Sequence, residues 1–316
     1  MTIPTSQLPP RPPLSLPTEV VTPPGWQPWP ELAYDEWRET LATLHMLSQM
    51  VGKTRLALAP PEPQWAHVAL PVTVEGLTTG PMPIGTRVLQ IDIDLVAHQV
   101  RVATADGVAA RFPIADRSVA DLYGELTQRL RDLGCPVEIN PVPKEVPDPV
   151  PFVDNTERVA YDGSAARRFL TVLLFADRAL KRFRAPFAGR HTPVQFYWGT
   201  FDLGYVRYSG QPARAPEGDV ILHYAMNAEE IAFGFWPGDT RYPRPAFYSY
   251  TYPRPGGIDE APIAPAGAAW NSDLGEFLLP YDVARHATAP EEAVLAFLQA
   301  SYDAGVRLGG WPPEFR

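Results

Sequence analysis

Apolar residues recur at every third or fourth position in four stretches of the chain, the spacing that places them on one face of a helix. The first stretch begins near Tyr34 and carries Trp37 and Leu41, and Gly52 is a stop signal at its far end. We therefore predict four helices, over residues 34–51, 119–133, 165–184 and 291–305.

Between the helices, short segments rich in β-branched and aromatic residues predict strands. In residues 90–95 polar and apolar side chains alternate, which is typical of an antiparallel strand with one exposed face. The first half contains such segments at 54–58, 67–75, 87–96, 98–104 and 108–112, and the second half at 194–201, 203–208, 219–226, 230–236 and 246–252.

Helices segregated from runs of consecutive strands indicate the α+β class. Each half contains a helix, then several antiparallel strands, then a helix, an arrangement that a diverged duplication would produce, although the halves share little residue identity. A Rossmann fold is not expected, because no glycine-rich turn joins a predicted strand to a helix.

Proline divides the chain. Residues 141–151 hold five prolines in eleven positions, which neither a helix interior nor a central strand accommodates. We interpret this segment as a linker between an N-terminal half (26–140) and a C-terminal half (152–316); the alternative is a buried strap between the halves. Residues 1–25 hold eight prolines and predict an extended tail.

Composition narrows the function classes. The chain of 316 residues has a formal net charge of −9, which disfavours binding to a nucleic-acid backbone. Cys135 is the single cysteine and has no partner for an internal disulfide, as in a reducing compartment. Because we find neither an apolar run of membrane-spanning length nor a secretory signal, we expect no membrane association and a cytoplasmic location.

Five strings of the sequence are familiar together: WPELAYDEWRETLATLHMLSQMVGKTRL (29–56), HVALPVTVEGLTTGPMP (67–83), PVQFYWGTFDLGYVRYSG (193–210), GFWPGD (234–239) and LGEFLLPYD (274–282). The chain resembles a bacterial family that is catalogued as a domain of unknown function. This resemblance covers nearly everything after Trp26. It implies a cytosolic bacterial protein and supplies no catalytic residue.

Aromatic residues are densest between positions 194 and 252, with carboxylates among them. The phenols of Tyr248 and Tyr250 share one face of a predicted strand. An aromatic face edged by carboxylates suits a sugar or another flat, partly apolar ligand; the alternative is that these aromatics are the core of a sheet. Trp270 follows a long loop that could close over the face and bring Trp270 and Glu276 to a ligand. The predicted ligand-binding residues are Trp198, Trp236, Tyr248, Tyr250 and Trp270.

The candidates for catalysis are two carboxylates and two histidines. Asp202 and Glu229 stand among aromatics that could hold one of them protonated, as a glycosidase requires. His45 shares a helix face with Gln49 and Lys53, and the alternative for it is a buried histidine bonded to its neighbours. His191 precedes a strand, and no metal-binding spacing of histidines occurs.

These observations favour a small-molecule binding protein or enzyme with an aromatic, carboxylate-edged pocket in the second half. A hydrolase using Asp202 and Glu229 as acid and base is the first alternative. The second is a structural or interaction protein whose proline-rich tail docks a partner as an extended helix. We predict no cofactor and no metal, and the sequence leaves the ligand, the reaction and the oligomeric state open.

Overall fold

The computed structural model describes residues 27–158 and 160–312. The predicted tail of residues 1–25 lies outside these residues. In the first half the helices are α1 (Tyr34–Leu58) and α2 (Val119–Asp132), with a short 3-10 helix, Pro63–Trp65, between them. The strands are β1 (Gly76–Thr78), β2 (Met82–Ile84), β3 (Arg87–Asp94), β4 (Gln99–Thr104) and β5 (Ala109–Pro113).

The second half has four α-helices: α3 (Gly163–Arg184), α4 (Val220–Ala225), α5 (Tyr281–Arg285) and α6 (Pro290–Leu308), with a 3-10 helix at Ile258–Glu260. Its strands are β6 (Gln195–Tyr197), β7 (Asp202–Pro212), β8 (Ala228–Trp236), β9 (Ala246–Tyr252), β10 (Ala269–Asn271) and β11 (Glu276–Pro280).

All strand pairs in both sheets are antiparallel. The first sheet has the order β1-β3-β4-β5, with β2 also paired to β3, and the second has the order β10-β11-β9-β8-β7-β6. The α+β class is therefore confirmed. The sheets differ in strand number and order, so a duplication of the halves stays a prediction.

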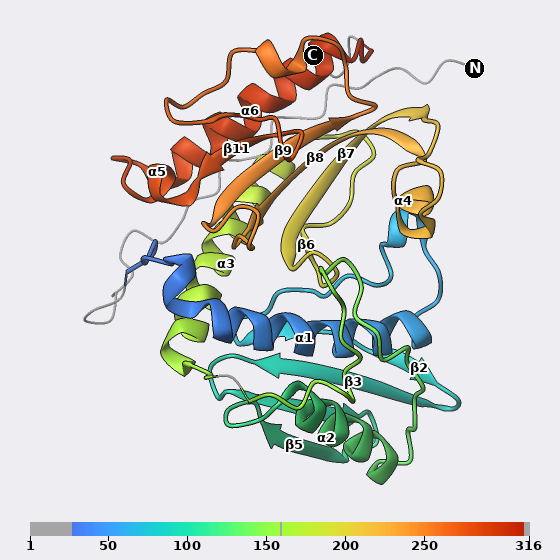
Figure 1. Cartoon of the computed structure of the whole chain (residues 1–316). Helices are drawn as coiled ribbons and strands as arrows, with labels where there is room; N and C mark the ends of the chain where they lie inside the picture. The colour runs from blue at the N-terminus through green and yellow to red at the C-terminus, as the bar shows by residue number, and fades with distance from the viewer. Residues whose placement is uncertain (1–26, 159, 313–316) are drawn as a thin grey trace, which may run out of the picture.

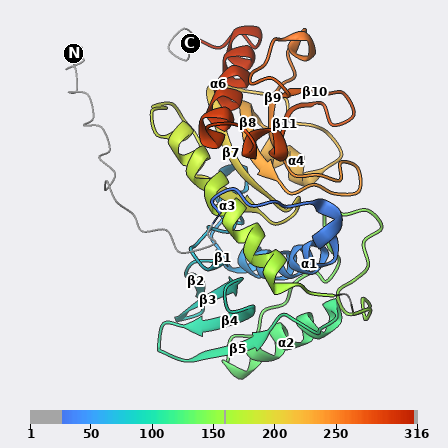
Figure 2. The ribbon, with the colours of Figure 1, turned by 90° about the vertical axis from the view of Figure 1, so that its left-hand side faces the viewer.

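The two sheets lie at opposite ends of the molecule, and α1 runs across the middle between them (Figure 1). Helix α3 lies behind β7–β9 in that view, and Figure 2 shows it descending from the second sheet to α1. One face of the second sheet packs on α3 and α6. The other face of this sheet is free of helices where β7, β8 and β9 lie side by side (Figure 1).

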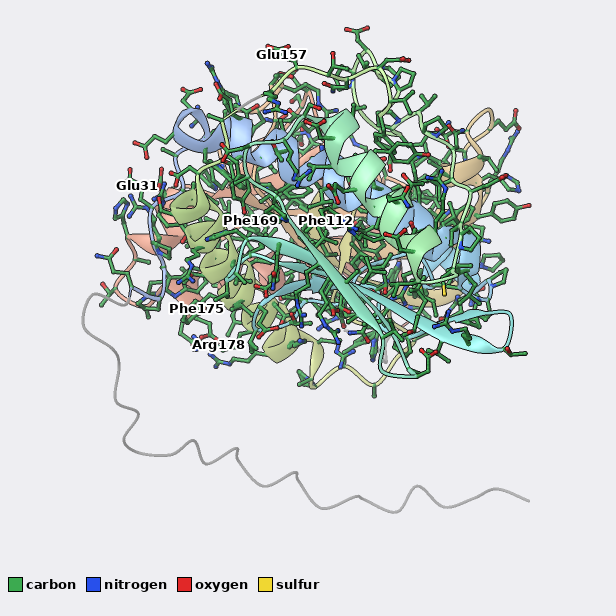
Figure 3. All side chains as sticks on the ribbon, turned by 90° about the horizontal axis from the view of Figure 1, so that it is seen from below. Glu31, Phe112, Glu157, Phe169, Phe175 and Arg178 are labelled. Carbon is green, nitrogen blue, oxygen red and sulfur yellow. The ribbon has the colours of Figure 1, made fainter. Side chains whose placement is uncertain are left out.

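One hydrophobic core runs through both halves. Phe112 on β5 and Phe169 on α3 belong to this core and lie near the centre of Figure 3, whereas the exposed Glu31 and Glu157 lie at its margin. Trp37 of α1 stacks on Phe169 at 4.9 Å between ring centroids. Residues of the two halves therefore pack against each other within this core. Among the described residues, no helix combines the length and apolar character needed to span a bilayer.

The predicted helix stop at Gly52 is wrong, because α1 continues to Leu58 and takes in the predicted strand 54–58. Gly52 serves packing instead of capping. A Cβ atom at this position would lie 2.2 Å from the Trp198 ring, so glycine lets the indole lie directly on the helix backbone.

Two other predicted strands are also wrong. Residues 67–75 form isolated bridges at Leu70 and Val72, and strand β1 begins after them. Residues 219–226 hold helix α4, because the Asp219 side chain accepts hydrogen bonds from the amides of Ile221 and Leu222. This N-cap outweighs the β-branched residues that favoured a strand.

The proline-rich segment 141–151 is bound to α1. The Gln49 side chain donates to Lys144 O at 2.6 Å and accepts from Lys144 N at 3.1 Å, and Lys53 Nζ donates to Val142 O at 2.8 Å. Pro143 is buried, while most other residues of the segment are exposed. We call residues 141–151 the strap, because these hydrogen bonds attach the segment to α1.

Candidate functional site

The helix-free side of the second sheet carries a set of tyrosines and carboxylates. Residues that pair directly across an antiparallel sheet point to the same side, and alternate residues of a strand point to opposite sides. The register pairs Gly204 with Gly234 and Gly234 with Tyr248. We call this side the tyrosine face; its main members are Tyr197, Asp202, Tyr208, Glu230, Tyr248, Tyr250 and Glu276.

Two glycines allow the Tyr248 ring to lie flat on the sheet. A Cβ atom at Gly234 would lie 2.4 Å from this ring, and one at Gly204 would lie 3.2 Å from its hydroxyl oxygen. The Tyr248 side chain reaches from β9 across β8 to β7, where its hydroxyl donates to Asp202 Oδ2. Thr200 Oγ1 donates to the other oxygen of Asp202. The tyrosine is thereby fixed at both ends, with its ring half-buried.

Tyr250 lies beside Tyr248 in the same orientation. The two rings are nearly parallel, with an interplanar angle of 8° and 6.4 Å between centroids. The Tyr250 hydroxyl donates to Glu230 Oε1 over a long 3.4 Å. The two parallel rings are both half-buried, and each has a carboxyl group at its hydroxyl end.

The carboxyl groups of this face have raised pKa values. Burial raises the pKa of Glu230 to about 8, opposed by the Tyr250 hydrogen bond. Burial and the negative charge of Asp202 raise the pKa of Glu276 to about 8, opposed by Arg241. Burial also raises the pKa of Asp202, although the hydroxyls of Thr200 and Tyr248 favour its charged form. A face with several carboxyl groups that resist ionisation is a frequent property of functional sites.

The strap borders the tyrosine face. Glu145 as a whole is exposed, but its carboxyl end lies against Gly199, where a Cβ atom would meet Oε2 at 1.8 Å. Burial of this group and the negative charges of Asp202 and Asp219 raise its pKa to about 7. Gln49 also donates to Gly199 O at 3.2 Å. Helix α1 is therefore hydrogen-bonded both to the strap and to the turn that precedes β7.

His45 also forms a hydrogen bond with Gly199. Its Nε2 lies 2.9 Å from Gly199 O, and because a carbonyl can only accept, Nε2 carries the proton. Burial lowers the pKa of His45, which keeps the ring neutral. The half-buried histidine stands 5.2 Å from the Phe201 ring, and its partner Gly199 is distant in the sequence and not one of the neighbours expected for a bonded core histidine.

Trp236 is the last residue of β8 and lies at one end of the tyrosine face. Its indole is 9% exposed and stacks on Tyr242 at 6.1 Å between centroids. The Arg241 guanidinium lies 5.9 Å from the indole and is paired with Asp239 at 2.8 Å. The turn after β8 therefore folds back over the tryptophan, which leaves it less accessible than the two tyrosines.

Two predicted ligand-binding tryptophans lie elsewhere. Trp198 Nε1 donates to Val68 O at 2.9 Å in the seam with α1, and the residue is 8% exposed. Trp270 on β10 pairs with Phe277, whose neighbour in the register is Ser249 on the side opposite to Tyr248. The structure thus brings Tyr248, Tyr250 and Trp236 together on one face and separates Trp198 and Trp270 from them.

Two predicted catalytic residues are also apart from Asp202. Glu229 Oε2 accepts from Ser209 Oγ at 2.7 Å, and strand alternation places Glu229 on the side opposite to Glu230. His191 packs its ring 5.8 Å from the Tyr205 ring and lies 2.7 Å from Thr192 O through Nδ1. The predicted Asp202 and Glu229 pair is therefore not assembled on one face.

Two carboxylates of the site, Glu145 and Glu230, were not among the predicted site residues, and Glu276 was expected only together with Trp270, on a loop that closes over the face. Strand alternation could have indicated Glu230, which has the same parity as Gly234 and Trp236. Glu145 carries no such signal, because it reaches the face through the strap.

The first sheet offers a contrasting hollow of about 510 Å³ on its outer side. There Asp92 accepts from Thr78 Oγ1 at 2.6 Å and from Gln90 Nε2 at 2.8 Å, and it is paired with Arg101 at 3.1 Å. Its carboxylate is therefore satisfied and neutralised by its own sheet. Among residues 27–158 and 160–312 the carboxyl groups of the tyrosine face form no such neutralising pairs, and we take this face as the candidate site.

In the described part of the chain, no three His, Cys, Asp or Glu side chains are placed to hold a metal ion. Neither a curated protein nor a solved structure matches the chain. A family model with the description "Family of unknown function (DUF5996)" matches residues 29–315. Because this match covers nearly the whole sequence, the chain belongs to that family.

Proposed function

We propose that the protein binds a small organic ligand on the tyrosine face. The observation that carries this proposal is the aromatic surface of Tyr248 and Tyr250, parallel to within 8° and fixed by Asp202 and Glu230. Rings that are held in place before a ligand arrives lose little conformational entropy on binding. A flat ligand with an apolar side and polar edges would stack on the rings and meet the carboxyl groups.

A binding screen with variants of single tyrosines tests this proposal. We would screen a fragment library by ligand-observed NMR against the wild type, Tyr248→Ala, Tyr250→Ala and the control Tyr224→Ala. Tyr224 lies on α4 and is 53% exposed, outside the face. Fragments that bind the wild type and the control should be lost with the other two variants. Fragments that bind all four proteins equally, or no binding at all to the wild type, would contradict the proposal.

A hydrolase is the second candidate, favoured by one observation. Glu276, with its pKa raised to about 8, stands close enough to Asp202 to feel its charge. One protonated and one ionised carboxyl group can serve as general acid and as base or nucleophile. In this proposal Glu276 takes the role that the sequence analysis gave to Glu229. A panel of nitrophenyl glycosides tests it: hydrolysis should fall at least a hundredfold in Asp202→Asn and Glu276→Gln, and an unchanged rate in either variant counts against it.

A further inference from the structure

Four carboxyl groups reach the tyrosine face from four different segments. They are Glu145 of the strap, Asp202 of β7, Glu230 of β8 and Glu276 of β11. None of the four forms an ion pair with another described residue. Many of the ion pairs that the protein does form join exposed side chains at its surface. The face therefore concentrates carboxyl groups whose ionised forms have no ion-pair partner among the described side chains.

Glu230 is the most deeply buried of the four carboxyl groups. It is 3% exposed, and its single hydrogen bond within the described chain is the long one from Tyr250 to Oε1. No donor of the described residues bonds to Oε2, and this oxygen is not among the fully buried ones that lack a partner. Glu230 thus keeps an acceptor free on the tyrosine face.

The cations nearest to the face are engaged with other groups. Arg241 is paired with Asp239. Arg190 stacks on Tyr208 with 4.6 Å from Cζ to the ring centroid, and its Nη2 donates to Gln64. A cation that came to rest between Glu230 and Glu276 would have to come from outside the chain.

We propose that the ligand is a small organic cation, an amine or a quaternary ammonium ion, seated on the rings of Tyr248 and Tyr250 beside Glu230 and Glu276. This inference rests on the proposed function and adds the chemical class of the ligand. The ring faces attract a cation through their quadrupole, and the attraction grows in a partly desolvated site. A neutral sugar would gain stacking but would leave the carboxyl groups without counter-charge.

Binding of such a cation should release protons. Below pH 8 Glu230 and Glu276 are largely protonated, and a bound cation favours their ionised forms. The titratable groups that face Glu230 are the hydroxyls of Tyr197, Tyr208 and Tyr250. Those that face Glu276 are Asp202, Arg241, Tyr248 and Tyr250.

Isothermal titration calorimetry of the full chain tests the charge requirement. The probes are choline and butane-1,4-diamine, with 3,3-dimethylbutan-1-ol as the uncharged isostere of choline and methyl glucoside as a neutral sugar. We expect at least one cation to bind ten times more tightly than both neutral probes. Titrations in two buffers of different ionisation enthalpy should show proton release at pH 7.

Glutamine variants locate the charge. In Glu230→Gln and Glu276→Gln the affinity for the cation should fall at least tenfold. The matched control is Glu229→Gln, since Glu229 adjoins Glu230 but is bonded to Ser209 on the other side of the sheet. If circular dichroism shows that Glu230→Gln does not fold, Glu276→Gln alone decides, because Glu276 is half-buried and its side chain has no hydrogen bond to a described residue.

Each contrary result has one meaning. If a neutral probe binds as tightly as the cations and loses its affinity in Tyr248→Ala, the cation class is wrong while the proposed binding function stands. If a cation binds equally well to the two glutamine variants, its site lies elsewhere and the inference fails. If no probe binds and the fragment screen also finds nothing, the proposed function fails as well.

Discussion

Gly52 and Gly234 each support an aromatic ring at the place where a Cβ atom would stand. Gly52 carries Trp198 in the seam between the halves, and Gly234 carries Tyr248 on the tyrosine face. At the sequence level both glycines look alike, and the first resembled a helix stop. Trp198 is 146 positions from Gly52, and Tyr248 is 14 positions from Gly234. Such contacts form only in the folded chain, so the local sequence pattern does not predict them.

We predict that Gly52→Ala lowers the free energy of unfolding by about 1–3 kcal/mol or more, because the methyl group would overlap the Trp198 ring. Gly124→Ala is the matched control: Gly124 lies in α2 with open space around it. That variant should gain about 0.5–1 kcal/mol through helix propensity alone. Urea denaturation followed by circular dichroism measures both changes, and a neutral Gly52→Ala would contradict the packing described for Trp198.

Arg207 shows how a buried cation is held without a carboxylate. It is 3% exposed, with Cζ 3.8 Å from the Phe183 centroid and 4.4 Å from that of Tyr302. Its Nη2 donates to Phe183 O at 2.6 Å and its Nε to Tyr205 Oη at 3.0 Å. The planar guanidinium can stack and donate at once, which a lysine ammonium group cannot do.

Arg207→Lys should therefore lower the free energy of unfolding by about 2–4 kcal/mol, in the range for breaking a buried polar network. The exposed Arg190, which stacks on Tyr208, supplies the control, and Arg190→Lys should stay within about 0.5–1 kcal/mol of the wild type. Equal midpoints of the two variants in urea would show that the aromatic surroundings of Arg207 contribute little.

At the scale of elements, the side-chain clamp of α1 positions the strap. Gln49 forms two hydrogen bonds with the Lys144 backbone, and Lys53 forms one with Val142. The sequence predicted that His45, Gln49 and Lys53 share a helix face, and the length of α1 confirms this geometry. Their partners were not predictable, because the strap returns to α1 from about 90 residues farther along the chain.

Gln49→Ala should loosen the strap without unfolding the protein. The Lys144 amide loses its acceptor, so strap peptides should exchange hydrogen for deuterium at least tenfold faster. Gln128→Ala, which removes a bond to Asp132 on exposed α2, is the control and should leave strap exchange unchanged. Mass spectrometry of peptic peptides reads both, and unaltered exchange in Gln49→Ala would mean that other contacts hold the strap.

Most long elements followed from periodicity, including α2, α3, α6, β3, β8 and β9, because strong amphipathic patterns match their final environment. Short elements did not. Strands β10 and β11 span three and five residues and contain too few positions for a pattern. Likewise, the aromatic stretch predicted the candidate face. Which of its residues lie on which side of the sheet depends on the strand register, and this register shifts between Tyr208 and Pro212.

For the whole molecule, the raised carboxyl pKa values predict an unusual dependence of stability on pH. A glutamate whose pKa rises from 4.5 to about 8 on folding binds a proton more tightly in the folded state. Between these values the folded state holds more protons than the unfolded one, so stability falls as pH rises from about 4.5 to 8. Above pH 8 the loss is complete.

Glu230→Gln removes this penalty. The variant should match the wild type near pH 4.5 and be more stable at pH 9, by up to about 5 kcal/mol if the whole shift is expressed. Glu229→Gln is again the control and should change stability equally at both pH values. Urea midpoints at pH 4.5 and pH 9 measure the difference, and a Glu230→Gln variant that tracks the wild type at both would contradict the burial of an uncompensated carboxyl group.

The most direct measurement of the central claim is a pH titration of the protein with ¹³C-labelled glutamate carboxyl groups, followed by NMR. We predict two carboxyl resonances with midpoints near 8, one missing in Glu230→Gln and the other in Glu276→Gln. Saturating choline should lower both midpoints. Midpoints near 4.5 for both glutamates would contradict the account, because the tyrosine face would then hold ordinary surface carboxylates with no need for a cation.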